Sequence, residues 1–156
     1  MTDSFKSRLM RWRFNLSPVY RRTGARITYI SSDLREVRVK LPLNWKTRNY
    51  VGTIFGGSMY AAVDPLYMVM LINILGPEYI VWDKAASIKF KQPGRSTLRA
   101  EINISKAETD YIRKALKEQN KFDRTYQIEL TDEEGHICAV VEKIIHFKKK
   151  NDEKTP

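Results

Sequence analysis

The chain has 156 residues, of which 42% are hydrophobic and 29% charged, and its formal net charge at pH 7 is +10. This profile excludes an intrinsically disordered chain, and the length suits one domain, residues 1–156, with a hydrophobic core. The positive charge favours anionic partners such as nucleic acid, acidic lipids or phosphorylated molecules such as coenzyme A. The single cysteine, Cys138, excludes an intrachain disulfide and favours a cytoplasmic location.

The N-terminal segment, residues 4–16, has apolar side chains at helical spacing. These are Phe5, Leu9, Trp12 and Leu16. The spacing predicts a short amphipathic helix that Ser4 caps and that ends before Pro18. We expect the helix to pack on the domain, and contact of its basic residues with an anionic membrane is the alternative. The basic residues also interrupt any secretory signal.

Two segments, residues 25–31 and 36–41, alternate apolar and polar side chains, which predicts a β-hairpin. An irregular connection then leads to an apolar helix that runs to Leu75 and bends at Pro65. Residues 58–75 are barely long enough to span a membrane and contain both Asp64 and Pro65. We therefore expect a buried core helix and no integral membrane insertion.

The second half of the chain predicts four more strands. They are expected over residues 79–91, 97–105, 124–131 and 136–147, with a charged helical insertion over 106–120 and a polar tail over 148–156. About six antiparallel strands and one long apolar helix predict an α+β fold in which the sheet curls around that helix. An open sheet edge would be relieved by pairing between two protomers, so we expect a dimer.

The central feature of the sequence is residues 49–64. Gly56 and Gly57 precede the apolar helix, so backbone N–H groups can approach a ligand at the positive end of the helix dipole. Asp64 lies two turns further along, among apolar residues where a lone carboxylate is uncommon. Asp64 either carries chemistry or forms hydrogen bonds with nearby backbone or a tyrosine hydroxyl.

The spacing of these residues matches a known motif, which consists of Asn49, Gly52, Gly56, Gly57 and Asp64. It resembles that of the hotdog-fold acyl-CoA thioesterases of the PaaI-like type, and more closely an uncharacterised bacterial branch on that fold. The resemblance covers residues 24–147. It implies the hotdog fold, a dimer or a tetramer of paired dimers, and an acyl-CoA or acyl-carrier thioester as substrate. Coenzyme A would enter as part of the substrate, and no other cofactor is implied.

The resemblance also implies residue roles. The Gly57 N–H would stabilise the oxyanion, Asp64 would activate water or attack directly, and Asn49 would hold the carbonyl or the water, in a site shared across the dimer interface. Phe55 stands where the family has a histidine, and a phenyl ring donates no hydrogen bond. The alternative function is therefore a non-catalytic protein that binds acyl-CoA or an acyl carrier.

Further substrate-binding residues are expected around this motif, and they are Gly56, Phe55, Asp83, Lys84 and Arg95. The polar pair Asp83 and Lys84 could replace the missing histidine, and the alternative is an exposed ion pair at the end of a strand. Arg95 and nearby basic residues could hold the phosphates of coenzyme A. The two histidines lack partners at metal-ligand spacing, so no metal is expected, and the absence of a recognition motif argues against nucleic acid.

Overall fold

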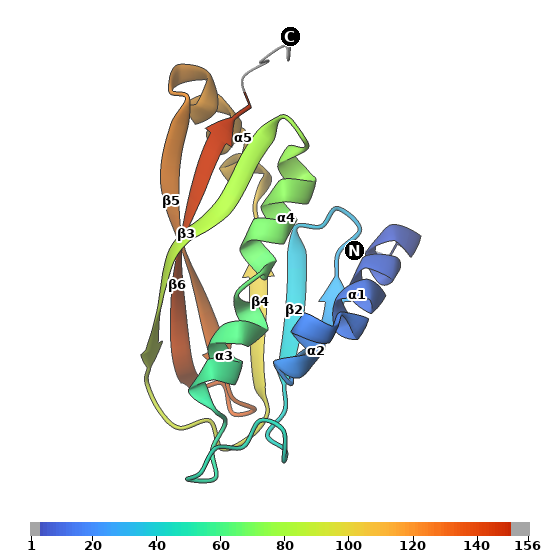
Figure 1. Ribbon diagram of the computed structural model, residues 1–156, viewed down its shortest axis with the longest axis vertical. Coiled ribbons are helices and arrows are strands. Elements are labelled where there is room, and N and C mark those ends of the chain that lie inside the picture. The colour runs from blue at the N-terminus through green and yellow to red at the C-terminus, as the bar shows by residue number, and fades with distance from the viewer. Residues whose placement is uncertain (1–3, 151–156) are drawn as a thin grey trace.

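The structure, a computed structural model, describes residues 4–150 and contains one antiparallel sheet with helices against it (Figure 1). The six strands have the spatial order β1-β2-β4-β5-β6-β3. Their bounds are β1 (Arg26–Ile30), β2 (Glu36–Leu41), β3 (Tyr79–Phe90), β4 (Leu98–Asn103), β5 (Lys121–Thr131) and β6 (Ile137–Lys149). The predicted α+β fold is confirmed. Strand β6 continues to Lys149, so the predicted tail begins later than expected, and residues 151–156 lie outside the described range.

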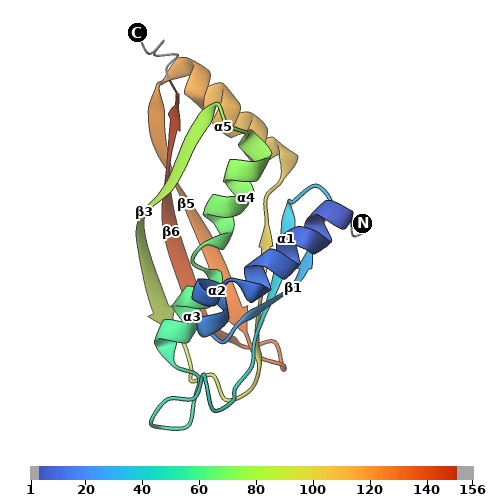
Figure 2. The same cartoon turned by 45° about the vertical axis from the view of Figure 1, so that its right-hand side comes forward.

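The apolar helix is divided into α3 (Gly56–Val63) and α4 (Leu66–Leu75), and the sheet curls around both (Figures 1 and 2). The division falls at the predicted place because Pro65 has no N–H to continue the helical hydrogen bonds. Residues Gly56–Leu75 are long and apolar enough to cross a membrane, but half of the segment is buried inside the fold. The prediction of a core helix is therefore confirmed.

The N-terminal segment forms two helices, α1 (Phe5–Leu16) and α2 (Pro18–Arg22). The Ser4 hydroxyl caps α1 as predicted. Helix α2 was not predicted; Pro18 occupies its first turn, where its fixed φ favours a helix. The Asn15 side-chain amide donates to the Ile27 carbonyl oxygen at 2.8 Å and accepts from the Ile27 N–H at 2.9 Å. Helix α1 therefore packs on the domain and covers the edge of β1.

The helical insertion is α5 (Lys106–Glu118), and an ion pair joins it to the sheet. The Glu108 carboxylate accepts from Nε and Nη2 of Arg124, both at 2.8 Å, and from the Tyr126 hydroxyl at 2.8 Å. Both oxygens of this carboxylate are therefore hydrogen-bonded. Burial of Ile112 and Leu116 completes the contact of α5 with the core.

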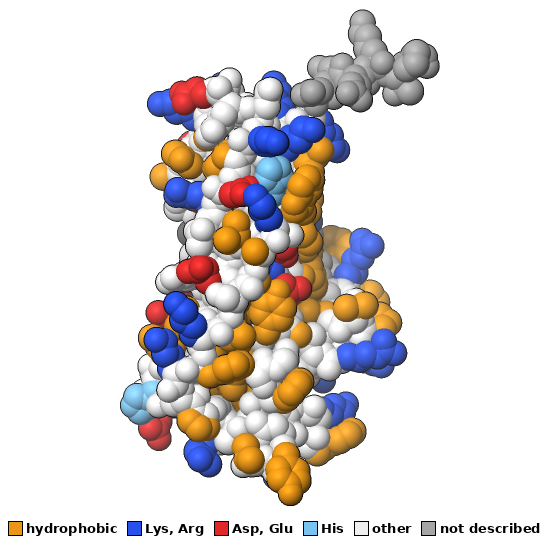
Figure 3. All heavy atoms as spheres, turned by 60° about the vertical axis from the view of Figure 1, so that its left-hand side comes forward, with side chains coloured by type: hydrophobic (Ala, Val, Ile, Leu, Met, Phe, Trp, Pro, Cys, Tyr) orange, Lys and Arg blue, Asp and Glu red, His pale blue; other side chains and the backbone are white. Residues whose placement is uncertain are grey.

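Strand β3 is the edge strand farthest from β1 in the strand order. Within residues 4–150 it pairs with β6 alone, and its other edge has no strand partner. Trp82 and Phe90 are exposed on it, and hydrophobic side chains gather over this side of the molecule in Figure 3. The edge has the features required for strand pairing between protomers, and the dimer stays a prediction.

Candidate functional site

A groove of about 820 Å³ lies where the loop before α3, the first turn of α3 and the end of β3 meet. Asn49, Phe55, Gly56 and Gly57 line it, so four of the predicted site residues come together here. Tyr60 from the next turn of α3 lines it as well. Arg95 is exposed in the turn beyond β3 and is not among the lining residues.

Two aromatic rings pack directly on the glycine pair. A Cβ atom at Gly56 would lie 2.6 Å from Phe90 Cζ, and one at Gly57 would lie 2.3 Å from Phe55 Cε1. Any side chain at either position would collide with a ring. The N–H of Gly57 lies in the first turn of α3, where backbone N–H groups have no acceptor within the helix. The groove therefore combines an apolar wall with backbone donors.

The Asn49 side chain shapes the loop that leads to the glycines. Its Nδ2 donates to Thr53 Oγ1 at 2.9 Å, and its Oδ1 accepts the N–H groups of Thr53 and Val51 at 3.0 and 3.1 Å. Gly52 within this turn has a φ of +83°, a conformation that favours glycine. The predicted contact of Asn49 with substrate or water stays a prediction.

Asp64 contacts a lysine that the sequence analysis did not single out. The Lys143 side chain is 0% exposed, and its Nζ lies 2.7 Å from Asp64 Oδ1, 2.6 Å from the Asp64 carbonyl oxygen and 2.8 Å from Asp83 Oδ2. An ammonium group has three hydrogen-bond donors, and here each meets one acceptor. Two predicted site residues, Asp64 and Asp83, are therefore joined by a buried cation.

Local backbone geometry makes this buried lysine possible. The break before Pro65 leaves the Asp64 carbonyl oxygen at the end of α3, where the helix dipole is negative and favours a cation. The pairing of β3 with β6 shifts register between Asp83 and Ala85, and such a bulge changes the direction of the side chains around it. Asp83 pairs with Lys143, whereas Lys84 pairs with Asp123. The alternative reading of Asp83 and Lys84 as an exposed ion pair with each other is therefore wrong, and their role in substrate binding stays a prediction.

The Asp64 carboxylate is ionised by its partners and is partly open. Burial alone would raise the pKa of Asp64, but hydrogen bonds from Lys143 and the Tyr60 hydroxyl together hold this pKa below its ordinary value. Tyr60 donates to Oδ1 at 2.6 Å, and burial, followed by the Asp64 contact, raises the pKa of Tyr60. Within residues 4–150 no group donates to Oδ2 of Asp64, and the side chain is 40% exposed. The reading of Asp64 as a hydrogen-bond partner of a tyrosine hydroxyl is therefore confirmed, and its catalytic role stays a prediction.

One oxygen of Asp83 also lacks a hydrogen bond within residues 4–150. Oδ1 of Asp83 is buried and has no partner among the described residues. A buried carboxylate oxygen without a donor is costly. The cluster of Asp64, Asp83, Lys143 and Tyr60, called the Asp64 cluster below, thus contains two carboxylate oxygens that accept no hydrogen bond from residues 4–150.

Gly57 and Asp64 lie at opposite ends of α3. They are separated by seven residues of helix, which at about 1.5 Å per residue is roughly 10 Å. The predicted sharing of one site between two protomers stays a prediction.

No candidate metal site is present in the part of the chain that the structure describes, because no three His, Cys, Asp or Glu side chains gather there. His136 contacts Asp132 and Glu134, and His146 contacts Asp123 on the outer side of the sheet.

Residues 6–146 match the family described as "Domain of unknown function (DUF4442)". The chain belongs to the DUF4442 family. No curated protein sequence matches this DUF4442 chain.

Solved structures with the same architecture include three bacterial proteins, all below 25% identity to this DUF4442 chain. PA5026 from Pseudomonas aeruginosa, a protein of unknown function described as a probable thioesterase, is 18% identical with a TM-score of 0.80 and covers 92% of this chain and 95% of its own. Thioesterase HI1161 from Haemophilus influenzae is 15% identical with a TM-score of 0.68, and the match covers 98% of this chain and 97% of HI1161. A mutant of thioesterase PA1618 from P. aeruginosa is 11% identical with a TM-score of 0.67, and the match covers 96% of this chain and 97% of PA1618. The predicted hotdog fold is confirmed.

Proposed function

We propose that this protein is a hydrolase of acyl-CoA or acyl-carrier thioesters, with Asp64 as the catalytic carboxylate. The observation that carries the proposal is the Asp64 cluster. Lys143 and Tyr60 bind one oxygen of Asp64 and leave the other open, and Tyr60 also lines the groove beside the glycine pair. Such a carboxylate is ionised at neutral pH, fixed in orientation and able to accept a proton from water. The hotdog thioesterases among the similar structures support the same reaction class.

In the proposed reaction, water attacks the thioester carbonyl carbon while Asp64 Oδ2 accepts one proton from that water. The carbonyl oxygen becomes an oxyanion and accepts a hydrogen bond from the Gly57 N–H of a second protomer. The carbon–sulfur bond then breaks, and the sulfur receives the proton held by Asp64. The products are a carboxylic acid and a free thiol, and the only groups required besides water are on the protein.

The second protomer is part of the proposal because Gly57 and Asp64 lie at opposite ends of α3 and the resemblance implies a site shared across a dimer interface. Pairing of two β3 edges would cover the exposed apolar side chains there and bring the two groove regions together. A group from the second protomer or from the substrate could also donate to the unpaired oxygen of Asp83. A dimer in the cytoplasm, with coenzyme A or a carrier as part of the substrate, is the proposed form.

Binding without turnover is the second candidate function, and the position of Phe55 favours it. The Phe55 ring packs on Gly57 and stands where the resemblance places a histidine. Phe55 and Phe90 are both more than half exposed at the groove, so they offer apolar contact to an acyl chain. This arrangement binds an acyl thioester without needing Asp64 to act.

An acyl-CoA panel of increasing chain length separates the two functions. Free thiol would be measured for the wild type, for Asp64→Asn, and for Asp110→Asn as a control on the exposed side of α5. Hydrolysis requires that Asp64→Asn lowers kcat by about a hundredfold to ten-thousandfold, because an amide cannot accept the proton. The control should retain the wild-type rate. Turnover that survives Asp64→Asn would contradict the mechanism, and calorimetric binding of every thioester without thiol release would establish the second function.

A further inference from the structure

The apolar side chains at helical spacing in α1 face solvent, which differs from the sequence-based expectation for an amphipathic helix that packs on a domain. Phe5, Leu9, Trp12 and Leu16, called the N-terminal stripe, are between 42% and 75% exposed. Successive residues of an α-helix are about 100° apart, so these four fall within an arc of about 60°. Helix α1 instead packs through its opposite side, where Ser7 is buried and Met10 and Phe14 contact the core.

The attachment of α1 does not need the stripe. The paired hydrogen bonds between Asn15 and Ile27, and the Arg11 hydrogen bond to the Thr28 carbonyl oxygen at 2.8 Å, hold the helix on β1. The Phe14 ring also packs edge-on against Tyr20, with ring centroids 5.7 Å apart. An ordered helix thus presents a convex apolar surface to solvent, continued on α2 by Val19, which is 79% exposed.

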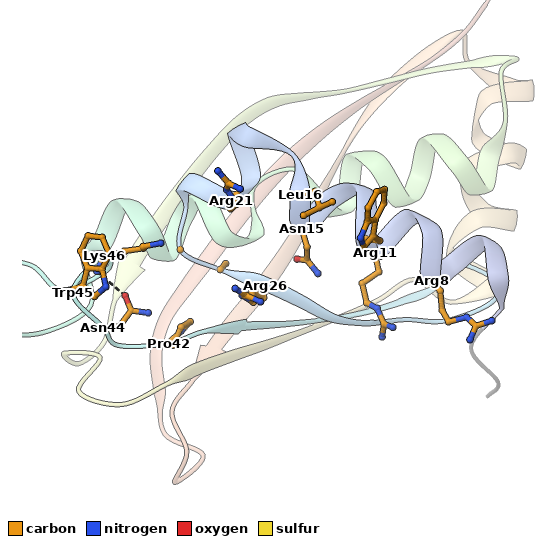
Figure 4. A pocket seen from close by; sticks show the side chains of 13 residues that line it. Arg8, Arg11, Asn15, Leu16, Arg21, Arg26, Pro42, Asn44, Trp45 and Lys46 are labelled. Atoms are coloured by element: carbon orange, nitrogen blue, oxygen red, sulfur yellow. Dashed lines mark hydrogen bonds between the residues drawn. The ribbon is translucent and has the colours of Figure 1, made fainter.

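Cationic side chains surround this surface. Residues 4–32 contain seven Lys or Arg and no Asp or Glu, so much of the +10 net charge lies in this one segment. At about 100° per residue, Lys6 and Arg13 lie on one side of the stripe and Arg8 lies on the other. Trp12 and Leu16 also form one wall of a groove of about 1120 Å³, which Arg8, Arg11 and Arg26 line from α1 and β1 (Figure 4). The exposed ring of Trp45 and the Lys46 ammonium close its far end.

We propose that α1 and α2 dock the protein on an anionic phospholipid bilayer. The stripe would enter the boundary between headgroups and acyl chains, the flanking Arg and Lys would contact lipid phosphates, and the groove would hold headgroups. A helix lying in the plane of a membrane has this arrangement of aromatic and aliphatic residues between basic ones. Anionic lipids complement the charge, and the proposal is independent of the thioesterase mechanism.

The distribution of charge and the order of the strands argue against a second copy of this chain covering the N-terminal stripe. Two copies facing each other here would bring like-charged segments together. The open sheet edge at β3 is at the other end of the strand order, and Figures 1 and 2 show α1 and α2 on the side of the molecule away from β3. A dimer formed through β3 would leave the N-terminal stripe uncovered in both protomers.

Flotation with lipid vesicles tests the proposal on the full chain. Vesicles of phosphatidylcholine alone are compared with vesicles in which about a third of the lipid is phosphatidylglycerol. The protein should float with the anionic vesicles only, and raising the ionic strength should weaken binding. Leu9→Gln with Trp12→Gln should reduce binding at least tenfold, because these substitutions remove apolar area from exposed positions.

Two double variants that remove the same charge isolate the electrostatic contribution to vesicle binding. Arg8→Gln with Arg13→Gln should weaken binding roughly fivefold for each cation removed. Lys114→Gln with Lys117→Gln removes the same charge from exposed positions on α5 and should bind like the wild type. Equal weakening by both pairs would show that net charge acts without a specific surface and would overturn the proposal.

A fluorescence measurement keeps the proposal testable if a stripe variant folds poorly. Trp45→Phe with Trp82→Phe leaves Trp12 as the remaining tryptophan, and its emission should shift to shorter wavelength with anionic vesicles. No shift and no flotation would overturn the proposal. Wild-type self-association that Leu9→Gln with Trp12→Gln abolishes would also overturn it, because a second copy would then cover the stripe.

Discussion

Two ion clusters join helices to the same sheet, but they differ in how completely their hydrogen bonds are satisfied. In the Glu108 cluster, which consists of Glu108, Arg124 and Tyr126, both carboxylate oxygens accept hydrogen bonds. In the Asp64 cluster, a fully buried Lys143 uses all three donors, yet Oδ2 of Asp64 and Oδ1 of Asp83 receive none from residues 4–150. A completed network stabilises the fold, whereas a network with open acceptors beside a groove can bind substrate or move a proton.

The largest expected effect is on stability, when the cation is removed from each cluster in turn. Lys143→Met should lower the free energy of unfolding by about 3–5 kcal/mol, because two partly buried carboxylates lose their counterion. Arg124→Met should cost about 1 kcal/mol, since the Arg124 side chain is 40% exposed and water screens its charge. Urea unfolding measures both. Adding Asp64→Asn and Asp83→Asn to Lys143→Met should restore most of the lost stability. If Lys143→Met and Arg124→Met lower the free energy of unfolding equally, the distinction between the two clusters is wrong.

A second comparison removes one carboxylate charge from each cluster and follows catalysis. Asp83→Asn should lower kcat by about tenfold. The substitution removes a negative charge beside Asp64, and it changes Oδ1, the oxygen that we expect to accept a hydrogen bond from the substrate or a second protomer. Glu108→Gln should leave kcat unchanged and affect stability alone. Thiol release and urea unfolding are measured for both variants. A catalytic loss in Glu108→Gln equal to that in Asp83→Asn would show that the two clusters do not have separate roles.

The smallest expected effect is the dependence of stability on acid pH. The pKa of Glu108 is lowered chiefly by the Arg124 hydrogen bond, and the pKa of Asp64 is lowered by Lys143 and Tyr60 against the opposing effect of burial. Each folded pKa is below its unfolded value of about 4, so the stabilisation is complete above that pH and is lost as pH falls through the folded pKa. Urea midpoints between pH 6 and pH 3 should fall in the wild type and fall less steeply in Asp64→Asn and Glu108→Gln. An unchanged slope in either variant would show that its carboxylate is not coupled to folding.

The motif around the glycines was predictable because its chemistry depends on residues that are close in sequence. Gly56 and Gly57 begin α3, Pro65 divides the apolar helix, and the strands follow the expected alternation. Lys143 was not predictable in the same way. It shares one face of β6 with the buried residues Val141 and Ile145, but Ile144 on the other face is also apolar, so alternation does not tell which face meets the core.

The sequence by itself determined every element except α2, their order, and the placement of a glycine pair two helical turns before a lone carboxylate. Only the tertiary structure decided which side of each element meets the core. It buried Lys143 against an aspartate 79 residues away, separated Asp83 from Lys84, and turned the N-terminal stripe toward solvent. The physical reason is that local spacing defines the faces of a helix or strand, whereas the partners that make burial of a face or a charge favourable come from distant parts of the chain.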